Sequence, residues 1–153
     1  REALLMAIFD TILQETRQKV LAEIITSDLP LEQRFVGAVN AFLTSHLDDP
    51  RRAKITTQEI LGVSQRVEAH RNVLITEFAL LIESYLTLLV AEGKLPARNY
   101  RILAFGIVGA MHELQIAWLN QQVPQQREVL VAEIDYLMQI MMKGVSVVSD
   151  KEN

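Results

Sequence analysis

The residues best suited to chemistry in this sequence are His112 and Glu113, which lie in the stretch AFGIVGAMHELQIAWL. They begin the pattern H-E-x-x-H, in which two histidines one helical turn apart bind zinc and the glutamate is a general base. Here the fifth position is Ile116, and the other two histidines do not stand at helical ligand spacing from His112. The sequence also lacks a nucleophile elbow and a glycine-rich phosphate loop. We therefore expect no metal site, no cofactor and no enzyme activity.

The composition predicts one helical domain. The chain has 153 residues, of which 50% are hydrophobic and 22% are charged, which is enough for a substantial core. Gly and Pro are sparse, and helix-forming residues are common. The lack of cysteine excludes disulfides and thiolate metal sites and fits a cytoplasmic location. A net charge of −4 disfavours nucleic-acid binding, because that function needs a cationic surface.

The two longest apolar stretches, residues 73–91 and 102–119, carry ionisable side chains near their middle. These side chains are Glu77 and Glu83 in the first stretch and His112 and Glu113 in the second. Ionisable groups at that depth are costly in lipid. We therefore expect both stretches to be packed helices of a soluble domain, with no membrane partner.

Pro, Gly and capping residues divide the chain into about six helices joined by short turns. The predicted helices cover residues 1–25, about 30–47, 50–61, 65–91, about 97–122 and 127–145. Pro30 and Pro50 start helices, Gly62 ends one and Ser64 caps the long fourth helix. The stripes we expect to be buried are Leu4, Leu5, Ile8, Ile12 and Leu13 in the first helix, Phe35, Val39, Phe42 and Leu43 in the second, and Leu74, Phe78, Leu81, Tyr85 and Leu89 in the fourth. No alternating strand pattern is present, so the predicted fold is all-α.

The last two predicted helices have more apolar surface than a domain of this size is expected to cover. The helix at 97–122 has one face of large apolar residues and a second face of small residues, and the last helix has a wide apolar stripe. Small residues let two helices approach closely, so a second copy across a two-fold axis, giving a four-helix bundle, is the simplest partner. The alternative is that the other helices of the same chain cover this surface. The predicted dimer interface consists of Gly106, Gly109, Glu113, Ala117, Leu130, Ile134, Leu137 and Met141.

Four stretches of the chain, in this order, resemble parts of tetracycline-repressor-like (TetR family) transcription regulators. REALLMAIFD resembles the start of the family's fourth helix, and DDPRRAKITTQEILGVSQRVEAHR, residues 48–71, resembles the junction of its sixth and seventh helices. AFGIVGAMHELQIAWL resembles the eighth helix, and residues 127–145 match the position of the ninth. The resemblance covers nearly the whole chain, and the order and spacing of the stretches carry it.

The resemblance implies that residues 1–153 form a C-terminal effector-binding and homodimerisation domain, in which the last two helices dimerise. It implies a cavity for a small, mainly apolar effector among helices within roughly residues 30–119. It also implies that the helix-turn-helix lies upstream of Arg1, so that operator DNA is contacted only by residues absent from this chain. We expect the domain of a transcriptional repressor, and the alternative is a stand-alone helical protein-protein interaction module.

The candidate ligand-binding residues are aromatic or polar side chains next to apolar stripes. A mainly apolar pocket with a few polar anchors is typical of small-molecule sites. We expect Phe42 to close the pocket from the second helix, and Glu59 with Thr56 to form a polar side. The full predicted set is Phe42, Glu59, Phe78, Tyr85, Phe105 and His112.

Three polar candidates have a structural alternative, which is favoured in each case. The Tyr85 hydroxyl can bind a backbone carbonyl instead of a ligand, since a buried phenol needs a partner. His112 can be a hydrogen-bonded structural histidine. Glu113 can pair with a partner subunit at a dimer interface instead of facing the cavity.

Overall fold

In the computed structural model the chain is all-α, and the structure describes residues 1–152, with side chains described through Val145. Within this range there are six α-helices, one short 3-10 turn and one π-helical turn, and no strand. In chain order the elements are α1 (Glu2–Ile25), η1 (Leu31–Gln33), α2 (Arg34–Leu47), α3 (Pro50–Lys54), the π-helical turn η2 (Ile55–Glu59), α4 (Gln65–Ala91), α5 (Arg101–Leu119) and α6 (Arg127–Glu152).

Three of the predicted start and stop signals, Pro50, Ser64 and Gly62, act where the sequence places them. Pro50 occupies the first turn of α3, and the Asp49 side chain accepts a hydrogen bond from the Arg51 amide at 3.1 Å. Ser64 caps α4 by accepting from the Val67 amide at 3.2 Å. Gly62 has φ 71°, a left-handed conformation that glycine adopts without steric cost, and it lies in the turn before α4.

Three predicted helices differ from the observed ones. The single helix expected over residues 50–61 is a short α-helix that changes into the π-helical turn η2, which widens the backbone by one residue per turn. The fifth helix begins at Arg101 instead of near residue 97. In addition, η1 is a separate 3-10 turn, so α2 starts at Arg34 and not at Pro30.

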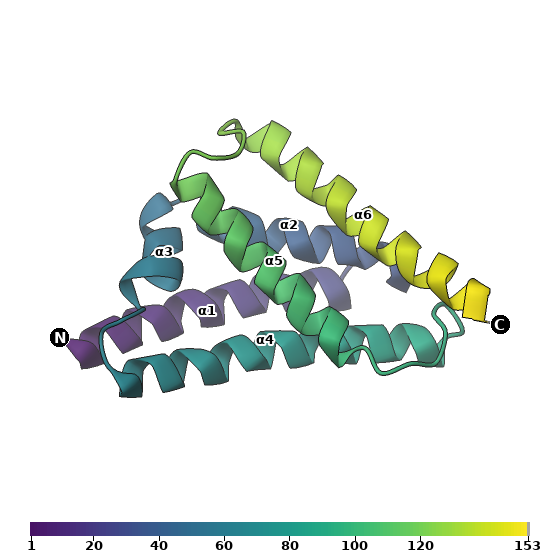
Figure 1. Cartoon of the computed structure of the whole chain (residues 1–153), viewed down its shortest axis with the longest axis horizontal. Helices are drawn as coiled ribbons and strands as arrows, with labels where there is room; N and C mark the ends of the chain where they lie inside the picture. Colours follow the sequence, from purple (N-terminus) through teal and green to yellow (C-terminus); the bar gives the residue numbers. More distant parts are fainter. Residues whose placement is uncertain (153) are drawn as a thin grey trace.

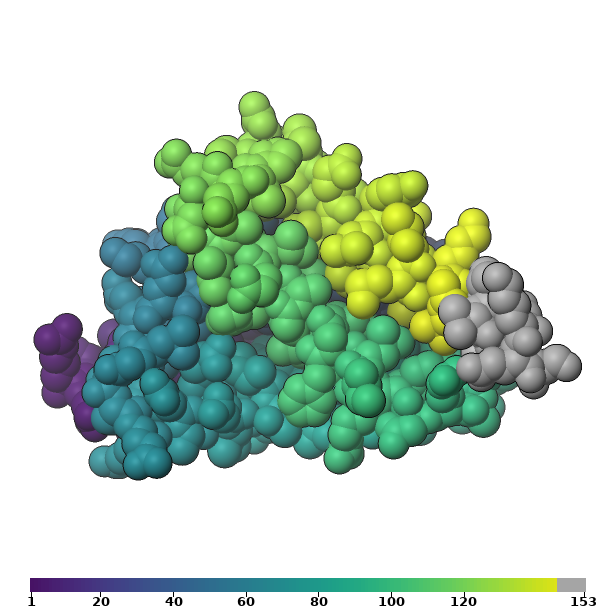
Figure 2. Space-filling model, in the orientation of Figure 1, coloured from purple at the N-terminus to yellow at the C-terminus, as the bar shows by residue number. Residues whose placement is uncertain are grey.

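The helices form a layered arrangement in which α5 crosses the others (Figure 1). α1 packs on α2 and α4, α5 packs on α4 and on α3 with η2, and α6 packs on α2. From the turn that joins them, α5 and α6 diverge, and together they occupy much of the face shown in Figure 2. The chain therefore places α1, α2, α4 and α5 around one interior space.

Two groups of buried side chains form the core. The larger joins α2 to α4, α5 and α6 through residues such as Leu43, Leu86, Ile107 and Met138. The smaller joins α1 to the start of α4, around Phe9 and Val67. Phe42 packs against both groups from α2, so the two parts of the core meet at that side chain.

Most predicted stripes are buried, and one is partly wrong. Phe35, Val39 and Leu43 in α2 and Phe78, Tyr85 and Leu89 in α4 are buried as expected. In α1, however, Leu4 and Ile8 are exposed, and the buried face contains Phe9, Ile12, Leu13 and Thr16. Thr16 is buried because its hydroxyl is satisfied by Ser45 Oγ at 2.7 Å and by the Ile12 carbonyl at 2.8 Å.

Two described helices, α4 and α5, are long and apolar enough to cross a membrane by length and composition alone. The core helices of soluble proteins meet the same criterion. Here α4 packs on both α1 and α5 and carries Arg71, Glu77 and Glu83, each of which pairs with a side chain on α1 or α5. The expectation that neither helix spans a membrane stays a prediction.

Candidate ligand-binding cavity

A cavity of about 300 Å³ lies between α1, α2, η2, α4 and α5. This volume is at the lower end of the range of small-molecule sites. Most of its wall is aliphatic or aromatic, and the lining residues include no Asp, Glu, Lys or Arg. The cavity therefore has the composition of a site for an uncharged, mainly apolar molecule.

The wall from α1 was not expected, because the predicted cavity began near residue 30. Leu13, Val20, Leu21 and Ile24 of α1 all line it. Their intervals of seven, one and three positions place all four within about 100° of the helix circumference, on one side of α1. A molecule in the cavity would thus touch α1 directly.

Four of the six predicted ligand-binding residues line the cavity: Phe42, Phe78, Tyr85 and His112. Phe42 and Phe78 meet edge to face, with their ring centroids 5.7 Å apart. Whether any of the four contacts a ligand stays a prediction, but the structure brings them together from α2, α4 and α5.

Glu59 and Phe105 do not line the cavity. Glu59 lies at the end of η2 with its side chain half exposed, 3.7 Å from Lys54 Nζ. The π-helical turn directs its neighbours Thr56 and Thr57 inward instead. Phe105 shares a face of α5 with His112, but the two residues are seven positions, or about 10 Å, apart. Only the His112 end of that face reaches the cavity, and Phe105 is exposed.

The hydroxyl groups of the cavity wall are already hydrogen-bonded to the backbone. The Tyr85 hydroxyl donates to the Leu31 carbonyl at 2.6 Å, which is the structural alternative considered for this residue, and burial raises the pKa of Tyr85 to about 12. Ser84 donates to the Leu80 carbonyl at 2.9 Å. Thr57 donates to the Ala53 carbonyl at 2.7 Å, and Thr56 bonds the carbonyls one turn before it.

His112 is held by Arg71 of α4, whose Nη2 lies 3.0 Å from His112 Nε2. Because a guanidinium only donates, Nε2 accepts, and the proton of the neutral ring is on Nδ1. Burial and then the positive charge of Arg71 lower the pKa of His112. The structural role considered for His112 is thus present, and it coexists with a position on the cavity wall.

His46 and Gln115 line the cavity but were not predicted as site residues. Each is a polar residue on an otherwise apolar helix face, His46 one turn after Phe42 and Gln115 one turn after Met111. That pattern was a usable signal, because a polar side chain on a buried face needs a hydrogen-bond partner. The spacing in the sequence did not show that the amide of Gln115 and Nε2 of His46 would lack a hydrogen-bond partner.

The predicted dimer-interface residues fall into two groups. On α5, Gly106, Gly109 and Glu113 are exposed, Ala117 is partly exposed, and a Cβ added at either glycine would meet nothing within 4 Å. On α6, Leu137 and Met141 are at least partly exposed, whereas Leu130 and Ile134 are buried.

The placement of Leu130 and Ile134 at an interface is therefore corrected. With Met138, they pack against α2 in the core of the same chain, so they are not available to a partner. The outward face of α6 consists instead of Val129, Tyr136, Leu137 and Ile140. The sequence showed that the apolar stripe of α6 is too wide for contact with a single helix. Which of its residues face inward and which face outward depends on the rotation of α6 against α2.

No three His, Cys, Asp or Glu side chains gather into a possible metal site in the part of the chain that the structure describes. Comparison with family models, with curated proteins and with solved structures finds no match to this chain. The functional argument therefore depends on the cavity and on the exposed faces of α5 and α6.

Proposed function

We propose that this chain is the effector-binding and homodimerisation domain of a TetR-like transcriptional repressor. The observation that carries the proposal is the apolar cavity of about 300 Å³ bordered by α1, α2, η2, α4 and α5. Protein interiors are normally close-packed, with few voids larger than a water molecule. A void of this size, about ten times the volume of one water in the liquid, is typical of a site that takes a ligand.

The contact of the cavity with α1 supports a regulatory role. α1 is joined to the rest of the domain by packing on α2 and by side-chain pairs at its surface, Arg52 with Glu15, His70 with Asp10 and Arg17 with Glu77. A molecule that enlarges the cavity would push on α1 against these contacts. Its different affinity for two positions of α1 would then shift the balance between them.

In a TetR-like regulator the DNA-reading segment precedes this first helix, so a shift of α1 changes the separation of the two DNA-reading heads in a dimer. Operator binding would belong to residues outside this chain, in agreement with its net charge of −4. Effector binding would release the operator, which is the behaviour of a repressor.

The test of effector binding is thermal denaturation with a panel of uncharged, mainly apolar compounds. A ligand at a hundred times its Kd stabilises the folded state by about 2.7 kcal/mol, because it binds only that state. The matched control is Ala38→Leu, which fills part of the cavity from α2. We expect at least one compound to raise the Tm of the wild type and not of Ala38→Leu. If no compound distinguishes the two proteins, the cavity is not a ligand site.

The dimer is tested by light scattering at tens of micromolar. We expect twice the mass of one chain, and we expect Tyr136→Glu with Ile140→Glu to reduce it to the mass of one chain, because both side chains lie on the outward face of α6. The matched control, Gln58→Glu with Gln65→Glu, adds the same two charges at exposed positions outside α6. A control that also dissociates would contradict an α6 interface.

The second candidate function is a stand-alone helical interaction module. The observation that favours it is the apolar outer surface of α5 and α6, where Ile102 is 87% exposed and Tyr136 is 63% exposed. Exposed apolar surface of this kind marks interaction sites. A wild-type chain that is monomeric in light scattering, together with a cavity that binds no compound, would favour this candidate over the repressor domain.

A further inference from the structure

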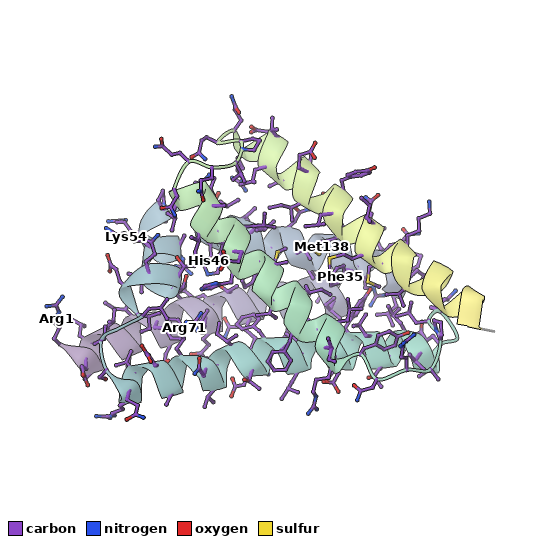
Figure 3. The ribbon with its side chains drawn as sticks, in the orientation of Figure 1. Arg1, Phe35, His46, Lys54, Arg71 and Met138 are labelled. Carbon is purple, nitrogen blue, oxygen red and sulfur yellow. The ribbon has the colours of Figure 1, made fainter. Side chains whose placement is uncertain are left out.

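The cavity has two ends of different chemistry, as the positions of His46 and Phe35 on either side of α5 illustrate (Figure 3). What we call the apolar end, beside η1 and the second half of α4, consists of Ile24, Phe35, Ile82, Tyr85 and Leu88. What we call the polar end, beside α3 and η2, consists of His46, Thr56, Thr57, His112 and Gln115. The hydroxyls next to this end, on Tyr85 and Ser84, already donate to the Leu31 and Leu80 carbonyls. Unused hydrogen-bonding capacity is thus concentrated at the polar end.

His46 offers an acceptor to the cavity. Its Nδ1 lies 2.9 Å from the Phe42 carbonyl, and because a carbonyl only accepts, Nδ1 carries the proton. The residue is 1% exposed, and burial lowers its pKa to about 4, so the ring is neutral at pH 7. Nε2 is therefore an unprotonated acceptor, and it has no hydrogen-bond partner among the described residues.

Gln115 gives an independent observation. It is 3% exposed and lines the cavity from α5, yet neither its amide oxygen nor its amide nitrogen has a hydrogen-bond partner within residues 1–145. The amide atoms are unpaired but are not sealed off from accessible space, so they face the cavity, where a ligand can reach them. The great majority of buried polar side chains are hydrogen-bonded. An amide left free at the cavity wall is explained if a bound molecule satisfies it.

The charge around the polar end favours an uncharged ligand with a donor. The nearby cations, Arg52 and Arg71, bind Glu15 and His112 through their terminal nitrogens and do not line the cavity, although the Nε of each is buried without a hydrogen-bond partner. Thr56 and Thr57 donate to backbone carbonyls, so only their oxygen lone pairs remain. With His46 Nε2, the polar end presents mainly acceptors. A carboxylate would meet no cation on the cavity wall there, and only the Gln115 amide and the Nδ1–H of His112 could donate to it, so its desolvation would be poorly compensated.

We propose that the polar end binds the hydroxyl or N–H group of an uncharged ligand, which donates to His46 Nε2 and is held by the Gln115 amide, while its apolar body fills the rest of the cavity. This inference rests on the proposed effector-binding function and names the class of effector. An apolar cavity of about 150 Å³ holds one benzene ring. A volume of about 300 Å³ therefore suits a body of about two rings.

The test is isothermal titration of the wild-type chain with 2-naphthol, its methyl ether 2-methoxynaphthalene, and 2-naphthoate. The ether keeps the rings and the oxygen but cannot donate, and the naphthoate is charged. We expect 2-naphthol to bind at least tenfold more tightly than the ether, and the naphthoate to bind more weakly than both. Equal affinities for naphthol and ether, or tightest binding of the naphthoate, would overturn the proposed head-group recognition while leaving a ligand-binding cavity. Failure of all three probes to bind would overturn the cavity function as well.

Two substitutions at the polar end test which side chains recognise the donor group of the ligand. Gln115→Met keeps the length of the side chain and removes the amide, and His46→Phe keeps a ring and removes Nε2. Each substitution should lower the affinity for 2-naphthol at least fivefold. The affinity for the ether should stay within twofold of the wild-type value. Ser84→Ala is the control, because it removes a hydroxyl of the cavity wall that already bonds the Leu80 carbonyl. If Ser84→Ala lowers naphthol affinity as much as Gln115→Met, the assignment to the polar end is wrong. Gln115→Met decides the matter alone if His46→Phe does not fold.

Discussion

Two regions of the molecule are rich in apolar side chains: the interior between α1, α2, α4 and α5, and the outer surface of α5 and α6. The surroundings of these side chains differ between the two regions. In the interior, apolar side chains from several helices surround a space that they do not fill. On the outer surface, side chains such as Ile102 and Tyr136 point away from the chain and have no cover within it. The first arrangement suits a molecule small enough to be enclosed, and the second suits a partner with a surface of its own.

The comparison also shows why surplus hydrophobicity in a sequence has no single meaning. α5 contributes to both regions, with Ile107 buried in the core and Ile102 exposed five residues earlier. The same helix is therefore part of a cavity wall on one face and part of an exposed apolar surface on another. Substitutions that separate these faces test the comparison directly.

The largest expected effect comes from the two isoleucines of α5. Ile107→Ala should lower the free energy of unfolding by about 2–5 kcal/mol, because it removes buried methylenes from a packed core. Ile102→Ala should change that of the isolated chain by no more than about 0.5 kcal/mol. Urea denaturation at several protein concentrations measures both. A cost of Ile102→Ala that grows with protein concentration would show that a second copy covers the outer surface.

The interior contains a buried titratable group, so its stability should depend on pH. The pKa of His46 falls from 6.5 to about 4 on folding, mainly because of burial, with Arg52 and Lys19 contributing in the same direction. Between these two values the unfolded chain binds more protons, so the free energy of unfolding decreases as pH falls from about 6.5 to about 4. The expected loss is about 3 kcal/mol.

Denaturation curves across this pH range measure the effect, and His46→Phe is the control that should remove most of it. The pKa of His112 is also lowered, so a smaller dependence of the same sign should remain in His46→Phe. An identical pH dependence in the variant and the wild type would contradict the burial of a neutral His46.

Substitutions of two buried alanines test whether the interior next to each of them contains unfilled space. Ala38 lines the cavity, whereas Ala79 is fully buried and does not line it. Ala79→Leu should lower the free energy of unfolding by about 1–3 kcal/mol through overpacking. Ala38→Leu should cost less than this or stabilise the chain, because its added methylenes have space. Thermal denaturation without ligand compares the two, and equal costs would mean that the cavity closes in solution.

The smallest effect is expected at a surface ion pair between two helices that border the cavity. Arg17 of α1 and Glu77 of α4 lie 3.4 Å apart, and both side chains are about half exposed. Glu77→Gln should change the free energy of unfolding by less than about 1 kcal/mol, and added salt should reduce the difference further. A larger effect would show that α1 is held mainly by this pair and not by its packing on α2.

Helix positions were predictable because their signals are local. Pro50, Ser64 and Gly62 act within one turn of chain, and each ends or starts an element where expected. The buried face of α1 was less predictable, because apolar residues lie on more than one side of this helix. Packing on α2 and α4 determines that Phe9 is buried and Leu4 is exposed. No local signal in the sequence predicted the π-helical turn η2. Because of this turn, Thr57 faces inward and Glu59 faces outward.

The candidate site was predicted in part for the same reason. Phe42, Phe78, Tyr85 and His112 were recognisable as aromatic or polar residues beside apolar stripes, and all line the cavity. Gln115 and His46 were not recognised, because what distinguishes them is a polar group without a partner, the amide of Gln115 and Nε2 of His46. The absence of a partner is a property of everything that surrounds a side chain, and no spacing in the sequence encodes it.

By itself the sequence determined the all-α class, the main helices and the apolar character of α5 and α6, because side-chain periodicity and capping residues act over a few positions. The tertiary structure decided that α1 lines the cavity, that Leu130 and Ile134 face α2 while Tyr136 faces outward, and that about 300 Å³ remains unfilled. These outcomes depend on the rotation and separation of helices far apart in the chain, which many small packing contacts set together.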